Sequence, residues 1–253
     1  MFLHQIAARI SSKSLYTDTY YYDKSFSCRS KDLQFYRDAV GQAGSTVLEY
    51  GIGTGRMALA LASDGYSVVG VDNSLDMLST LRQRVAEQPP YIRERISWHY
   101  GDARDYELDR QFSAVLFPFN GLAHQHTYYD LDRFFTKVRR HIAPGGVFAF
   151  DVLLPLPKYM AGATYEEPRF WHEGLGKYCN CIKTTEYDPI SQIMKLTTEL
   201  CPIDGSDSNI LVTDIRQFFP EETNLMLRHH GFNVIERNLN LVDSIGYICK
   251  LSV

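Results

Sequence analysis

The sequence lacks an apolar run near the ~18 residues that a membrane span needs. Even "GVFAFDVLLPLP" is interrupted by Asp151 and contains two prolines. It also lacks a basic excess, because 26 Lys and Arg stand against 30 Asp and Glu, a formal net charge of -4. Such a chain offers no field to hold a phosphate backbone. We therefore expect no membrane and no nucleic-acid partner.

Cysteine is sparse and irregularly spaced. The five cysteines are an odd number in 253 residues and do not form a disulfide framework, which favours a reducing, cytoplasmic location. Cys179 and Cys181 form a C-x-C pair without a second pair to complete a metal site, so we expect no metal.

Strand and helix patterns alternate along most of the chain. Residues 45–51 and 67–72 are short buried-strand patterns, and helical patterns follow them at 56–66 and 74–87, with Ser74 as the expected N-cap. Strand, helix, strand, helix predicts an α/β fold with a doubly wound parallel sheet. Further strands are expected at 95–103, 111–119, 145–155, 233–239 and 245–253, and further helices at 128–142 and 220–232.

The periodicity changes to two between residues 157 and 219, as in "KYCNCIKTTEYD", which predicts an antiparallel insertion. Near the start, Phe2, Leu3, Ile6 and Ile10 have roughly helical spacing. We therefore predict three parts. These are an N-terminal helical cap at 1–40, a core formed by 41–156 and 220–253, and the insertion at 157–219.

Three glycines follow the first strand, in "LEYGIGTGR". Glycine there lets a ligand approach the backbone, and the next helix N-terminus offers free N–H groups. The spacing is G-x-G-x-G, and Arg56 occupies the place of the third dinucleotide glycine, so a nicotinamide cofactor is disfavoured. Asp72 ends the second strand about 20 residues on, where an acid accepts hydrogen bonds from ribose hydroxyls. Asp102 follows the third strand at the same end of the sheet.

With these motifs in order, the chain resembles the class I S-adenosylmethionine-dependent methyltransferases. "VLEYGIGTGR" is similar to their first motif, "VVGVDNSLDML" to the ribose segment, "YGDARD" to the adenine segment and "IAPGGVFAFD" to the entry into strand five. The resemblance implies a seven-stranded sheet with its last strand antiparallel. It also implies S-adenosyl-L-methionine as methyl donor and S-adenosyl-L-homocysteine as product. The donor-site residues implied are Tyr21, Glu49, Gly51, Gly53, Arg56, Asp72, Asn73, Met77, Asp102, Ala103 and Phe117.

The segment after strand four, "FPFNGLAHQHTY", resembles small-molecule members of the family, particularly the N,N-dimethyltransferases of deoxyamino sugars. The resemblance implies His124 as base or substrate-orienting group and Asn120 as an acceptor contact. A structural histidine that caps the next helix is the alternative for His124. The tyrosines before Asp23 are similar to an element that closes over the donor, with Tyr22 as our first choice. "QPPY" at 88–91 lies in the wrong loop for a nucleic-acid amine methyltransferase.

The insertion stands where small-molecule members carry a lid over the acceptor, and we name it the lid. Trp171, Tyr178 and Arg216 are its candidates for binding the acceptor. Burial of the aromatic residues in a strand, and pairing of Arg216 with Asp214, are the structural alternatives.

We therefore expect an enzyme that transfers a methyl group to a nitrogen of a small-molecule acceptor. An O-methyltransferase and a noncatalytic donor-binding module are alternatives. The sequence indicates neither the acceptor nor the oligomeric state.

Overall fold

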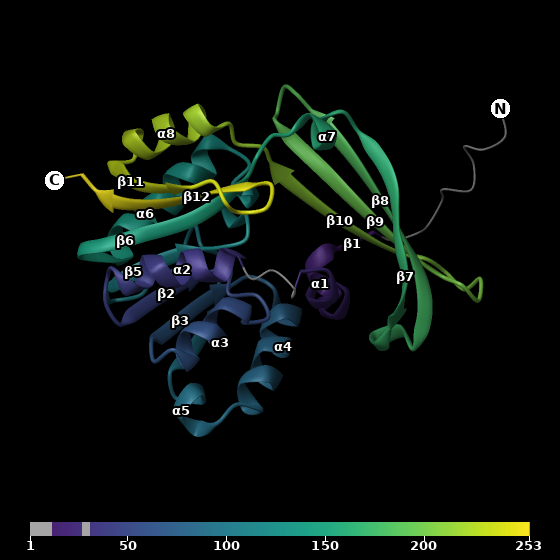
Figure 1. The fold of residues 1–253 in the computed structure, drawn as a ribbon, viewed down its shortest axis with the longest axis horizontal. Helices are drawn as coiled ribbons and strands as arrows, with labels where there is room; N and C mark the ends of the chain where they lie inside the picture. Colours follow the sequence, from purple (N-terminus) through teal and green to yellow (C-terminus); the bar gives the residue numbers. More distant parts are fainter. Residues whose placement is uncertain (1–11, 27–30, 253) are drawn as a thin grey trace.

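The computed structural model describes residues 12–26 and 31–252, so the helix expected from Phe2 to Ile10 lies outside the described residues. Figure 1 shows two bodies side by side, a sheet covered by helices and a curved antiparallel sheet, with helix α1 (Thr19–Phe26) between them. No helix of the described residues is long and apolar enough to cross a membrane.

The first body is built on a seven-stranded sheet with the order β11-β12-β6-β5-β2-β3-β4. β12 runs antiparallel to both of its neighbours, and the pairs among β6, β5, β2, β3 and β4 are parallel. The expected sheet, with its last strand antiparallel, is therefore confirmed. The strand order reverses at β2, which lies between β3 and β5, and such a point is where ligands bind in open α/β sheets. The strands are β2 (Thr46–Tyr50), β3 (Ser67–Asp72), β4 (Ile96–Tyr100), β5 (Phe112–Phe117), β6 (Ile142–Leu153), β11 (Phe232–Asn238) and β12 (Ser244–Leu251).

Helices cover both faces of this sheet, and each face has its own buried cluster. On one face, Phe134 and Leu227 from two helices pack against Phe148 of the central strand β6. On the other face, Tyr36 and Leu61 pack against Val47. The helix that carries Tyr36 therefore belongs to the core, although it lies within the segment expected as a cap. The first face is covered by α6 (Tyr128–His141) and α8 (Pro220–His229), and the second by α2 (Lys31–Gly41), α3 (Arg56–Ser63), α4 (Leu75–Ala86) and α5 (Pro90–Arg93).

Local signals in the sequence set the helix starts. The Ser74 hydroxyl accepts a hydrogen bond from the Met77 N–H (3.3 Å), as expected for the N-cap of α4. Thr127 and Asp130 form a capping box at the start of α6. These caps place the residues before α4 and α6 at the carboxyl ends of β3 and β5.

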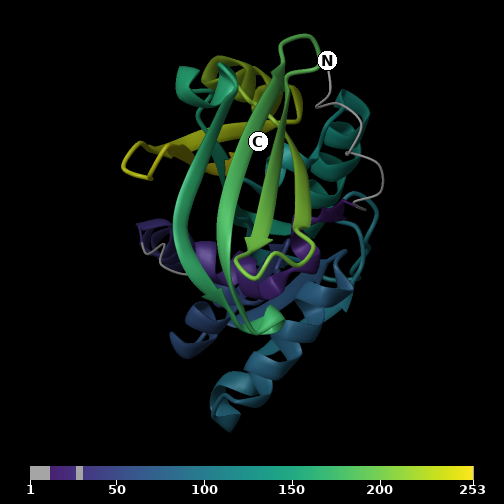
Figure 2. The same ribbon diagram turned by 90° about the vertical axis from the view of Figure 1, so that its right-hand side faces the viewer.

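The four strands of the lid form a five-stranded sheet together with β1, in the order β1-β10-β9-β8-β7. β7 to β10 pair antiparallel, and the N-terminal strand β1 adds to β10 in parallel. Along β8 the buried side chains alternate, so one face of the lid points inward. Figure 2 looks onto the lid and shows its strands crossing in front of α1. The elements are β1 (Lys13–Ser14), β7 (Ala163–His172), β8 (Lys177–Asp188), β9 (Ile193–Pro202) and β10 (Asn209–Arg216), with α7 (Pro157–Met160) before them and the 3-10 turn η3 (Glu173–Leu175) between β7 and β8.

The segment from β1 to α1 joins the two bodies. A 3-10 turn, η1 (Leu15–Thr17), follows β1, and Leu15 and Tyr21 pack with Phe170 and Cys181 of the lid. A second 3-10 turn, η2 (Gly121–His124), follows β5 on the core side. The chain thus places η1, η2 and α1 over the carboxyl ends of the central strands.

Candidate active site

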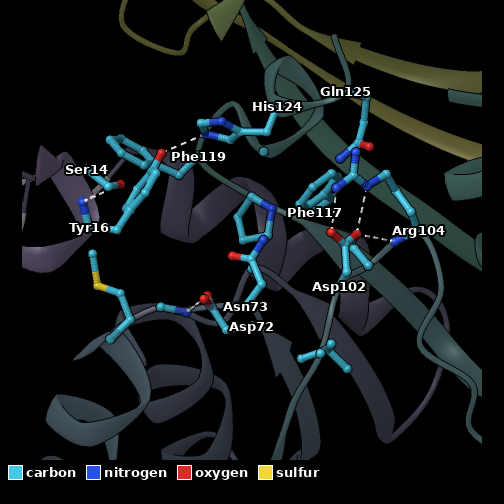
Figure 3. A pocket seen from close by; sticks show the side chains of 18 of the residues that line it. Ser14, Tyr16, Asp72, Asn73, Asp102, Arg104, Phe117, Phe119, His124 and Gln125 are labelled. Atoms are coloured by element: carbon cyan, nitrogen blue, oxygen red, sulfur yellow. Dashed lines mark hydrogen bonds and ion pairs between the residues drawn. The ribbon is translucent and has the colours of Figure 1, made fainter. Parts of the chain in front are cut away.

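A cavity of about 370 Å³ lies at the carboxyl ends of β2, β3, β4 and β5. Figure 3 shows Asp72 and Asn73 between the Tyr16–His124 pair on one side and the Asp102–Arg104 pair on the other. The position is the one expected from the reversal of strand order. The residues predicted for the donor or the chemistry that line it are Tyr22, Gly51, Gly53, Asp72, Asn73, Met77, Asp102, Ala103, Phe117 and His124.

A second cavity of about 50 Å³ is lined by two further residues predicted for the donor, Glu49 and Arg56. It shares Gly51, Gly53 and Tyr22 with the larger cavity, so the two adjoin through the glycine loop.

Glu49 is 2% exposed, and its Oε2 has no hydrogen-bond partner among the described residues. The pKa of this carboxyl lies well above its usual range, because burial raises it by more than the nearby Arg56 lowers it. Asp32 forms a bidentate ion pair with Arg56, which fixes the guanidinium beside the small cavity. A buried carboxylate oxygen without a partner, next to a fixed cation, matches the opposite charges of an amino-acid group.

The glycine loop holds Asp72 in place. Gly51 and Gly53 have φ of 65° and 57°, a region that glycine adopts without strain. The N–H of Gly53 donates to Asp72 Oδ2 and the N–H of Ser74 donates to Oδ1, both at 2.8 Å. Burial raises the pKa of Asp72, and these N–H groups oppose that shift. Each oxygen keeps a lone pair for a ligand hydroxyl.

At the other end, Asp102 is paired with Arg104, which the sequence reasoning did not select. Arg104 Nε donates to Asp102 Oδ1 (2.9 Å) and Nη2 donates to Oδ2 (2.6 Å). These bonds hold the pKa of Asp102 below its usual range. Arg104 Nη1 donates to Asp130 (2.7 Å), which links this end of the cavity to α6.

A hydrogen bond of 2.6 Å joins the Tyr16 hydroxyl to His124 Nε2. Burial lowers the pKa of His124 to about 4, and burial raises the pKa of Tyr16. At neutral pH the imidazole is therefore uncharged and the phenol protonated. The arrangement in which the Tyr16 O–H donates to an unprotonated Nε2 agrees with both shifts. Tyr16 and Ser14 line the cavity, and the sequence reasoning did not select either of them.

Aromatic rings surround the region beside this pair. The centroid of Tyr22 lies 5.9 Å from Tyr16 and 6.0 Å from Phe119, and Phe26 lies 4.9 Å from Phe119. Ring faces attract a cation once it is desolvated, so this cluster suits a positively charged group.

The loop after β5 is held by a buried carboxylate. Asp151 accepts hydrogen bonds from Tyr36 Oη (2.5 Å) and from the backbone N–H groups of Phe119 (2.7 Å) and Asn120 (3.1 Å). Both loop residues have φ of 58°, so Asp151 stabilises a strained turn at the cavity wall. The Asn120 side chain accepts from the Leu153 N–H (2.9 Å), and the structure does not place it in the cavity.

Four other predicted residues lie away from both cavities. The Tyr21 hydroxyl contacts Cys181 Sγ (3.4 Å) inside the lid interface. Trp171 and Tyr178 are 45% and 50% exposed and form an edge-to-face pair on the outer face of the lid, opposite buried Cys179 and Cys181. Arg216 is buried and pairs with Glu222 (2.7 Å). No ion pair between Arg216 and Asp214 is found within the described residues.

Asp23 fastens α1 over the cavities. It accepts hydrogen bonds from Thr54 Oγ1 (2.7 Å) in the glycine loop and from Arg84 Nη2 (2.6 Å) on α4. Tyr22, which directly precedes Asp23, lines both cavities.

Asp23→Asn is expected to weaken donor binding about tenfold, because losing a charge-assisted bond costs about 1.4 kcal/mol and loosens the position of Tyr22. Calorimetry with S-adenosyl-L-homocysteine measures the change. Asp38→Asn, on the exposed side of α2, is the matched control. Equal affinity in both variants would show that Asp23 does not hold α1 over the cavities.

One group of described residues has the spacing of metal ligands. It consists of Asp132, His229 and His230, on α6 and at the end of α8. None of the three lines either cavity, so we assign the group no part in the site.

The strand order, the glycine loop and the acids after β3 and β4 define the class I methyltransferase fold and the place where that fold binds its ligand. Residues 47–146 match the family model of a methyltransferase domain, and the chain as a whole has the class I methyltransferase fold.

Three known proteins illustrate the similarity. The dTDP-3-amino-3,6-dideoxy-alpha-D-glucopyranose N,N-dimethyltransferase of Streptomyces fradiae is 32% identical over 126 residues, 48% of this chain and 46% of that protein. The cypemycin N-terminal methyltransferase of a Streptomyces species is 31% identical over 119 residues, 47% of this chain and 46% of that protein. The chain thus spans about half the length of these curated relatives. The structure of the CcbJ methyltransferase from Streptomyces caelestis superposes with a TM-score of 0.79 at 20% identity, covering 96% of this chain and all of that one.

Proposed function

We propose that this protein is an S-adenosylmethionine-dependent methyltransferase that methylates a nitrogen of a small molecule. The observation that carries the proposal is the buried, unpartnered oxygen of Glu49 beside Arg56, in a small cavity that adjoins the larger one. A nicotinamide dinucleotide brings no ammonium group to the glycine loop, so it would leave this oxygen unpaired.

The described residues fit each part of the donor in order. Glu49 would accept from its ammonium group and Arg56 would face its carboxylate. Asp72 would accept from the ribose hydroxyls, and Met77 with the Asp102 end of the cavity would hold the adenine. When bound, S-adenosyl-L-methionine supplies an electrophilic methyl group on a positively charged sulfur.

Tyr16 and His124 act on the acceptor. Methyl transfer is an in-line displacement in which positioning supplies most of the acceleration. A nitrogen that gains a methyl group must lose a proton. The Tyr16 oxygen accepts that proton while its own proton passes to His124 Nε2, along the 2.6 Å hydrogen bond. The rings of Tyr16, Tyr22 and Phe119 line the cavity, where they would exclude water and stabilise the donor's positive charge.

The acceptor class is inferred from two observations. Pro118, Phe119 and Asn120 stand after β5, where the amine-specific nucleic-acid enzymes carry a different element. Relatives include the N,N-dimethyltransferase of an amino sugar and the N-terminal methyltransferase of cypemycin. These support an amine acceptor, of which a nucleotide-linked amino sugar is our first candidate.

A cytoplasmic location belongs to the same proposal. The four cysteines within the described residues are free thiols, which agrees with a reducing compartment.

The test is methyl transfer from donor labelled with deuterium in its methyl group to a panel of amino sugars, amino acids and simple amines. Mass spectrometry is expected to find a labelled product with a new N–CD₃ group and equimolar S-adenosyl-L-homocysteine. Donor binding without any product across the panel would favour the noncatalytic module.

The pH dependence should report on the acceptor rather than on His124. Because burial lowers the pKa of His124 to about 4, this residue is neutral and able to accept a proton at any pH well above that value. The acceptor amine can attack only with an unprotonated nitrogen, so kcat/KM should rise with pH through the pKa of that amine. With two acceptors of different basicity, the rising part of the pH profile should shift with the pKa of each amine. A limb fixed near 6.5 for both would mean that His124 titrates normally.

A further inference from the structure

We propose that the side-chain oxygen of Gln125 selects adenine in the donor, by accepting a hydrogen bond from its exocyclic amino group. The inference rests on the proposed function and adds a specificity-determining residue to it. Gln125 directly follows η2 and lines the larger cavity.

Gln125 is a buried amide whose acceptor lacks a donor. Gln125 is 4% exposed, and its Oε1 has no hydrogen-bond partner among the described residues. The backbone N–H of Gln125 donates to the Leu122 carbonyl (2.9 Å), which fixes the residue at the end of η2. Leaving a buried carbonyl oxygen unpaired is unfavourable, so the group is poised for a donor that a ligand brings.

Neighbouring side chains are already engaged with one another. Figure 3 shows Gln125 pointing toward the pair formed by Asp102 and Arg104. Both oxygens of Asp102 accept from Arg104, and the third guanidinium nitrogen, Nη1, donates to Asp130. Arg104 therefore occupies much of the hydrogen-bonding capacity of Asp102, the residue that the family resemblance assigned to the adenine edge. Gln125 supplies the acceptor that this pairing withdraws.

The chemistry of the ligand edge makes this contact selective. Adenine presents an amino group at position 6, a donor that suits Gln125 Oε1. Hypoxanthine presents a carbonyl oxygen at the same position, and with the amide oriented as in the structure it would face Oε1 with two acceptors and no proton between them. A ligand that leaves a buried polar group of the site unpaired is rejected far more strongly than a ligand that merely loses a contact.

The experiment compares the Kd of S-adenosyl-L-homocysteine with that of S-inosyl-L-homocysteine by calorimetry, on the wild type, Gln125→Met and Gln125→Asn. The wild type should prefer the adenine compound at least tenfold. Gln125→Met, similar in length but without the carbonyl, should reduce that preference about fivefold or more, mainly by weakening adenine binding. Gln125→Asn keeps the amide but withdraws it by one methylene, and it should also reduce the preference. Gln83→Met, on the exposed side of α4, is the matched control and should keep it.

The outcomes separate the two levels of the proposal. An unchanged preference in a folded Gln125→Met or Gln125→Asn overturns the assignment of Gln125, while donor binding by the wild type still supports the proposed function. A wild type that binds both compounds equally overturns the assignment without any variant. A wild type that binds neither compound contradicts the proposed function itself.

Discussion

Asp72→Ala is expected to weaken binding of S-adenosyl-L-homocysteine at least ~100-fold. The carboxylate would accept from two ribose hydroxyls, and hydrogen bonds to a charged group contribute about 1.5–3 kcal/mol each. The loss of two such bonds corresponds to more than two decades in Kd. Calorimetry with the purified variant measures the change directly.

Removal of Asp72 also leaves the N–H groups of Gly53 and Ser74 without their acceptor. Asp72→Asn keeps one oxygen for them and should give an intermediate affinity. Asp76→Ala, an exposed acid in the first turn of α4, is the matched control. If Asp72→Ala kept its native melting temperature and bound the compound as tightly as Asp76→Ala, the ribose would lie elsewhere.

His124→Ala is expected to lower kcat at least ~10²-fold with donor affinity nearly unchanged, the range typical of acid–base assistance. In the proposed mechanism this residue accepts the proton that Tyr16 passes on along their hydrogen bond. It lies on η2, away from the small cavity that would hold the donor's amino-acid group. Single-turnover rates with a saturating donor separate this effect from product release. His229→Ala, on the outer helix α8, should leave kcat unchanged.

A double variant tests whether the two residues work as one relay. Because Tyr16→Phe breaks the same hydrogen bond, it should lower kcat by a similar factor, and Tyr16→Phe with His124→Ala should cost little more than either change alone. If the losses in kcat from the two single changes multiplied in the double variant, the two side chains would have separate roles. Full turnover in His124→Ala would leave positioning as the whole of catalysis.

The sequence predicted the core well because its signals are local. "SVVGVD" is the buried strand β3, and Ser74 caps α4 as expected, since strand and cap depend on residues within a few positions of one another. The glycine loop and Asp72 lie at the carboxyl ends of adjacent parallel strands, so their convergence follows from the topology.

The sequence did not predict the parts of the site that depend on distant pairing. Tyr16 reaches the cavity because the strand before it pairs with β10, where Lys13 lies opposite Leu211. These two residues are about 200 positions apart, and no local period in the sequence encodes their contact. Likewise Arg104 follows Asp102 by two residues, but only the fold shows that it turns back onto that carboxylate.

The lid strands were predicted, but not which of their faces points inward. Alternation places Tyr178 opposite Cys179, and a period of two is the same for either face. The size of the aromatic side chains favours them as the binding face, whereas the structure buries the cysteines and exposes Trp171 and Tyr178. The low polarity and small size of cysteine were the signals in the sequence that indicated which face is buried.

The proposed function depends most on one ligand. The purified protein is titrated with S-adenosyl-L-homocysteine and, in a separate experiment, with NAD⁺. The first compound should show one saturable site per chain and the second none, and Asp72→Ala should lose the site. Saturation of the same site by NAD⁺, with no uptake of the thioether nucleoside, would contradict a methyl-donor site at the ends of β2 and β3.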